Sequence, residues 1–149
     1  MRVTWVLVVL LALSAGCWRE SAGVRVEFDE TLGTAILDLA HSDGVRPLKE
    51  LAPGDWTTVR VLIGPALGER VAAELGVAEG LEGDGTYRGG YAQDGNLLAF
   101  RRGDEVARVV GLGRLAVLGA GEYPADVVLR ARDGAITMTD PAGRPVGSR

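Results

Sequence analysis

The sequence predicts an α+β protein in which a mostly antiparallel sheet of about five to seven strands carries two amphipathic helices on one face. Two observations support this fold class. Two segments show the apolar spacing of amphipathic helices, and three glycine-containing turn dipeptides separate short apolar runs in the second half of the chain. Such tight turns join antiparallel strands, because parallel strands need long crossover connections.

The first half of the chain predicts strand, helix and helical turn in that order. Apolar and polar residues alternate over 24–28, which indicates a strand. Asp29 then stands in the position of a helix N-cap, and apolar residues recur at helical spacing over 29–40. A single helical turn opened by Pro47 is predicted over 46–51.

The clearest core strand is predicted at 56–63, where β-branched residues lie between a Pro-Gly and a Gly-Pro break. A second amphipathic helix is predicted at 65–75. Pro65 suits its first position because the missing N–H has no intrahelical partner there, and Gly76 supplies the C-terminal stop.

The second half of the chain is expected to form a meander of strands. Asp94-Gly95 is expected to join 86–93 to 96–102, Gly103-Asp104 to lead into 105–110, and Asp133-Gly134 to join 126–132 to 135–139. Residues 141–149 hold two prolines and two glycines and are expected to be a flexible tail.

The first seventeen residues have the order of an export signal. Arg2 precedes an apolar run over 3–13, which is well under the roughly 20 residues that a membrane-spanning helix needs. The tetrad that follows, from Ser14 to Cys17 (SAGC), resembles the lipobox of bacterial lipoproteins, in which leucine is usual where Ser14 stands. The resemblance implies cleavage between Gly16 and Cys17 and acylation of the Cys17 thiol.

Cys17 is the only cysteine of the chain, so it cannot form an intramolecular disulfide. A free thiol is unusual in an exported protein, and acylation would remove it; an ordinary secretory signal is the alternative. The lipoprotein hypothesis makes 1–16 a signal peptide, 17–23 a tether and 24–140 a single domain. This domain is expected on the extracytoplasmic face of the cell membrane, with the membrane and an envelope protein as partners.

Removal of residues 1–16 leaves 133 residues, which suits one compact domain with a sizeable core. The removed segment holds one arginine and no acidic residue, so the net charge changes from −4 to −5. This acidic balance and the lack of a basic cluster argue against nucleic acid as a partner.

The run from Gly111 to Ala116 (GLGRLA) has the outline of a dinucleotide-binding turn, and Asp133 follows Gly113 by about twenty residues. However, glycine soon interrupts the helix that should follow, and an exported domain would meet little nicotinamide cofactor. A glycine-rich bend at a sheet corner is the preferred interpretation, and no cofactor is expected.

No enzyme activity is predicted, because no catalytic constellation is recognisable. His41, Ser42 and Asp43 are adjacent in sequence, whereas triad groups converge from separate elements, so we expect the C-terminal turn of a helix. No metal site is predicted either. Three loop acids lack the alternation of an EF-hand loop and are interpreted as solvated: Glu79, Glu82 and Asp84.

Two further features have structural explanations. The tripeptide Arg102-Gly103-Asp104 spells an integrin-binding sequence but occupies an expected hairpin turn. The aromatic residues at strand positions could line a binding surface, but packing in the core or across strands is the expected role. These are Trp56, Tyr87, Tyr91, Phe100 and Tyr123.

The segment 56–110 combines a strand after Trp, a Gly-Pro break, a helix ending in Leu-Gly and the hairpin sequence LLAFRRGDEVARVV. This pattern loosely resembles small uncharacterised exported bacterial proteins and implies one compact α+β domain with no particular activity. The sequence therefore favours a lipid-anchored accessory protein that binds another envelope component. The alternatives are a small surface hydrolase whose acid pair the sequence does not single out, and a passive envelope component.

Overall fold

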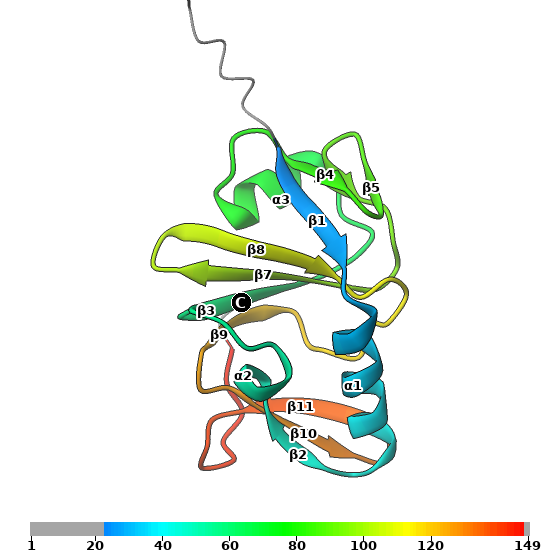
Figure 1. Ribbon diagram of the computed structural model, residues 1–149, viewed down its shortest axis with the longest axis vertical. Coiled ribbons are helices and arrows are strands. Elements are labelled where there is room, and N and C mark those ends of the chain that lie inside the picture. The colour runs from blue at the N-terminus through cyan, green and yellow to red at the C-terminus, as the bar shows by residue number, and fades with distance from the viewer. Residues whose placement is uncertain (1–22, 148–149) are drawn as a thin grey trace, which may run out of the picture.

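The computed structural model describes residues 23–147, so the predicted signal peptide, Cys17 and most of the predicted tether lie outside the described residues. Over this range the protein has the predicted α+β architecture, with a six-stranded mixed sheet, a three-stranded sheet, a two-stranded sheet and three helices (Figure 1). None of the helices within 23–147 is long and apolar enough to cross a membrane.

The six-stranded main sheet is mostly antiparallel, as predicted. Its order is β4 (Leu81–Gly83), β1 (Val24–Phe28), β8 (Glu105–Gly111), β7 (Asn96–Arg102), β3 (Thr58–Ile63) and β9 (Gly121–Pro124). β1 is the exception, because it runs parallel to both β4 and β8. The β7–β8 hairpin turns at Gly103, whose φ of 60° lies in the region that glycine favours.

The smaller sheet contains the predicted Asp133-Gly134 hairpin. Its strands are β11 (Ala135–Thr139), β10 (Val128–Arg132) and β2 (Val45–Pro47), all antiparallel. The chain after β11 was expected to be a flexible tail, but it folds back along that strand. Val146 N–H donates to the Met138 carbonyl at 3.2 Å, and Asp140 N–H donates to the Arg144 carbonyl at 2.8 Å.

The helices are α1 (Glu30–His41), α2 (Leu48–Leu51) and α3 (Gly68–Leu75). The Asp29 N-cap is confirmed, because its Oδ1 accepts from Leu32 N–H at 2.8 Å. α3 begins three residues later than predicted. Ala66 and Tyr91 exchange two backbone hydrogen bonds, of 2.8 and 2.9 Å, which hold the chain around Pro65 extended and outside the helix.

The helices α1 and α3 cover opposite faces of the main sheet, whereas we expected both on one face. Successive side chains of a strand point to opposite faces, and β7 is buried on both. Leu98 packs in the cluster that contains Ile36 of α1, while Leu97 packs in the cluster that contains Val71 of α3. Figure 1 accordingly shows α1 with the three-stranded sheet at one end, and α3 with β4 and β5 at the other.

The predicted hairpin around Asp94-Gly95 is wrong, because β7 pairs with β3 and β8 instead. The predicted strand over 86–93 is broken by Arg88 and Gly89, whose φ angles are 49° and 76°. It forms a separate small hairpin of β5 (Thr86–Tyr87) and β6 (Gly90–Tyr91). The short strands β2, β4 and β9 were not predicted. The helical turn expected over 46–51 is present as α2, but Arg46 and Pro47 belong to β2 instead.

Candidate functional site

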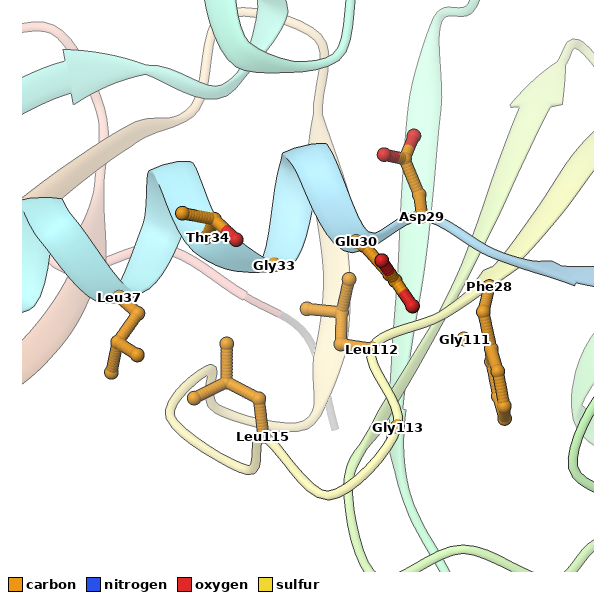
Figure 2. Close-up of a pocket in the computed structure, with 10 residues that line it drawn as sticks. All are labelled: Phe28, Asp29, Glu30, Gly33, Thr34, Leu37, Gly111, Leu112, Gly113 and Leu115. Carbon is orange, nitrogen blue, oxygen red and sulfur yellow. The ribbon is translucent and has the colours of Figure 1, made fainter.

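A groove of about 380 Å³ lies between the N-terminal half of α1 and the loop that follows β8 (Figure 2). We call it the α1 groove. It is lined by Phe28, Asp29, Glu30, Gly33, Thr34, Leu37, Gly111, Leu112, Gly113 and Leu115. Phe28 and Leu37 are 41% and 40% exposed, so the groove offers apolar side chains to a ligand from solvent.

The parallel pairing of β1 and β8 creates this site. Phe28 is the register partner of Gly111, so the two strands end at the same edge of the sheet. α1 begins directly after β1, and the loop over 112–115 begins directly after β8. The start of a helix and a loop therefore meet where two parallel strands end, which is where ligand sites are found in parallel sheets.

Gly111 permits the close packing at one end of the groove. A Cβ atom at this position would lie 2.8 Å from Tyr91 Oη and 2.9 Å from Phe28 ring atoms, so any larger residue would displace them. Tyr91 is 1% exposed, and its hydroxyl donates to the Gly113 carbonyl at 3.4 Å. Burial raises the pKa of Tyr91 to about 12.

Asn96 holds the loop that forms the other wall. This fully buried side chain accepts from Leu118 N–H at 2.9 Å and donates to the Leu118 carbonyl at 2.9 Å. Its backbone carbonyl accepts from Leu112 N–H and its N–H donates to the Leu115 carbonyl. We missed this residue in the sequence, where the available clue was a polar residue at the start of the apolar run Asn-Leu-Leu-Ala-Phe.

The charge at the start of α1 does not suit an anion. Asp29 caps the helix and pairs with Arg108 at 2.5 Å, and Figure 2 shows that Glu30, unlike Asp29, points into the groove. Two carboxylates therefore offset the positive end of the helix. Gly113, with φ of 61°, lies in a turn in which Leu115 N–H donates to the Leu112 carbonyl, and no helix follows in the described chain before β9. These residues do not fit a pyrophosphate group.

The other candidates from the sequence serve local structure. Ser42 Oγ donates to the Leu39 carbonyl at 3.1 Å, and Asp43 accepts from Asp133 N–H at 2.8 Å, so the segment after His41 forms the expected helix-end turn. Asp84 accepts from Phe28 N–H at 3.0 Å at the end of β1. Within the described residues, no group of three potential metal-ligating side chains is present.

Of the five aromatic residues that were expected to be packing partners, four are buried and one is exposed. Trp56, Tyr91, Phe100 and Tyr123 belong to the cores. Trp56 and Phe100 pack with ring centroids 5.1 Å apart. Tyr87 is the exception, because it is exposed.

Two carboxyl groups outside the groove have lowered pKa values. A hydrogen bond from Arg70 is the largest cause that lowers the pKa of Glu74; burial opposes it, and Arg60 lowers the pKa further. The backbone N–H and side chain of Arg144 lower the pKa of Asp140. These shifts are opposite to the raised pKa that a general acid needs, so we assign both groups to structural ion pairs.

The α1 groove thus combines leucine and phenylalanine side chains, glycine backbone and one free-standing carboxylate on its inner side. This combination suits the binding of an apolar segment that carries a basic group. No protein-family model, curated protein or solved structure matches this chain.

Proposed function

We propose that this protein is a lipid-anchored extracytoplasmic accessory protein that binds another envelope component through the α1 groove. The binding part rests on one observation: the α1 groove lies where the parallel strands β1 and β8 end, and it exposes Phe28 and Leu37. The tetrad from Ser14 to Cys17 supports the anchoring part.

The partner segment that best fits the groove is apolar with a lysine or arginine at one end. Leu37, Leu112 and Leu115 line the apolar part, and burial of each matching side chain contributes about 1.5–3 kcal/mol. Glu30 supplies the carboxylate for the basic group. Because the leucine side chains and the Glu30 carboxylate lie in one groove, a short segment of polypeptide is sufficient to contact them.

The anchoring part is tested by Cys17→Ser. The variant is expected to move from the membrane fraction to the soluble extracytoplasmic fraction, or to stay unprocessed. Mass spectrometry of the native chain should show an acyl mass on Cys17. A Cys17→Ser chain that fractionates with the membrane and migrates like the wild type would contradict the anchor.

The binding part is tested by a photoreactive amino acid at position 37 in producing cells. We expect one reproducible crosslinked adduct, which is lost when Gly33→Phe fills the groove. Gly33 is a suitable position because a Cβ there would meet nothing within 4 Å. The exposed His41 on the same helix is the control position for the crosslinker, and Thr31→Phe is the control for the added ring.

The comparison of adducts from positions 37 and 41 distinguishes binding in the groove from non-specific crosslinking. Equal adducts from positions 37 and 41, or an adduct that survives Gly33→Phe, would contradict the proposed groove. Binding at another surface would then have to explain the capture.

A further inference from the structure

A second cavity, of about 550 Å³, lies on the α3 side of the molecule and carries two highly exposed apolar side chains. Leu67, directly before α3, is 81% exposed, and Tyr87 of β5 is 65% exposed. Arg88 also lines this cavity, and its Cζ lies 5.1 Å from the centroid of the Tyr87 ring. We call these three residues the Leu67–Tyr87 patch.

The patch lies at the end of the domain where the described chain begins. Val24 N–H donates to the Gly80 carbonyl at 3.1 Å, and Leu81 N–H donates to the Gly89 carbonyl at 2.8 Å. Gly89 follows Arg88 directly, and the Arg88 carbonyl lies 2.8 Å from the position of a Cβ on Gly68. Figure 1 shows the same relationship, with the start of β1 beside α3, β4 and β5.

The length of chain before this point limits its distance from the proposed anchor. Only six residue steps separate Cys17 from Gly23. A fully extended chain spans at most about 3.6 Å per residue, so Gly23 lies within about 22 Å of the acylated cysteine. The end of the domain that carries the patch is therefore close to the lipid surface.

We propose that Leu67 and Tyr87 insert into the lipid surface to which the chain is anchored, so that the α3 end of the domain docks on the membrane. This inference rests on the proposed acylation of Cys17. Transfer of a leucine side chain from water into the acyl-chain region lowers the free energy, and a tyrosine ring favours the boundary between acyl chains and headgroups. The guanidinium of Arg88, held beside the Tyr87 ring, contacts lipid phosphates from the same position.

The charge around the patch indicates that insertion of apolar groups, and not attraction to anionic lipid, holds this end. Four exposed acidic residues and one further exposed arginine, Arg70, lie near it in the chain. The acidic residues are Glu69, Glu79, Glu82 and Asp84. The four carboxylates outnumber the two arginines, Arg70 and Arg88, and reduce any attraction to anionic headgroups. We therefore expect docking on zwitterionic phosphatidylcholine as well.

The test uses the full-length processed chain with Leu67→Cys, labelled with the environment-sensitive dye NBD and reconstituted into phosphatidylcholine vesicles. Acylation blocks Cys17, so the new thiol is the single labelling site. The wild-type chain, treated with the dye in parallel, checks this point. The matched control is Ala135→Cys, an exposed position on β11 in the sheet at the other end of the molecule.

Docking predicts a shift of the emission from position 67 to shorter wavelength and a loss of this emission when doxyl-labelled lipid is included, with neither change at position 135. A chain that floats with the vesicles but shows the same spectra at both positions would overturn the docking and leave the anchor intact. A chain that neither floats nor resists labelling of Cys17 would overturn the anchor and the docking together. Blue-shifted emission from position 67 without quenching by doxyl lipid would indicate a protein contact and would also overturn the proposal.

Discussion

Asn96 and Leu118 are joined by two hydrogen bonds in which a side-chain amide takes the part of a strand partner. Oδ1 accepts from Leu118 N–H and Nδ2 donates to the Leu118 carbonyl, each at 2.9 Å. The N–H and the carbonyl of Leu118 are buried together with the Asn96 side chain, so water cannot take the place of that side chain if it is removed. The loop between β8 and β9, which lines the α1 groove, therefore depends on one side chain of β7.

Replacement of Asn96 should destabilise the protein. Asn96→Leu leaves a buried N–H and a buried carbonyl of Leu118 without partners, and each costs about 1–3 kcal/mol. We expect the free energy of unfolding to fall by about 2–6 kcal/mol in urea titrations. Asp94→Asn, at an exposed position two residues earlier, should change it by less than about 0.5 kcal/mol. Equal effects of the two variants would exclude the role assigned to Asn96.

Two of the glycines that line the groove, Gly33 and Gly111, should respond in opposite directions to alanine. Gly111→Ala brings a methyl group against Tyr91 Oη and the Phe28 ring, and should lower the free energy of unfolding by about 1–3 kcal/mol. Gly33→Ala adds a methyl group in open space within α1, and should raise it by up to about 1 kcal/mol. Chemical denaturation of both variants measures these changes in the free energy of unfolding. A lower free energy of unfolding for Gly33→Ala would show that the space beside Gly33 is narrower than described.

Asp29 has two roles that substitutions can separate. Asp29→Asn keeps an oxygen for the Leu32 N–H but loses the charge that pairs with Arg108, a partly exposed pair that contributes less than about 1 kcal/mol. Asp29→Ala also loses the N-cap, and we expect a further loss of about 1 kcal/mol. Thermal unfolding at low and high salt gives the comparison. If asparagine destabilised as much as alanine, the ion pair and not the cap would be the important interaction.

Tyr91 should make the protein less stable at alkaline pH. Burial raises its pKa in the folded state to about 12, above its ordinary value of 10.0, so the folded state retains the proton over a range in which the unfolded state releases it. The stability present below pH 10 is lost as the pH rises toward 12, by up to about 2–3 kcal/mol. Tyr91→Phe should show a weaker decrease over this range, measured as the free energy of unfolding at each pH. Parallel curves for the two chains would mean that the hydroxyl is hydrated in the folded state.

The sequence was sufficient for those elements that short-range patterns specify. Alternation predicted β1, the N-cap position of Asp29 predicted the start of α1, and the turn glycines predicted the β7–β8 and β10–β11 hairpins. The α1 groove could not be predicted in this way, although Gly111 and Gly113 were recognised as a bend. Its walls come from residues 28–37 and 111–115, and only the parallel pairing of β1 with β8 brings them together.

Local chemistry thus specified the α+β class, the caps and the tight turns, because each depends on residues within a few positions of one another. The faces on which α1 and α3 pack, the partners of β7 and the role of Asn96 depended on the folded chain. A buried strand such as β7 is apolar on both faces, so its sequence does not say which helix covers which face. That choice is made by contacts between segments that are distant in the chain, and the same contacts form the groove and place Leu67 near the start of β1.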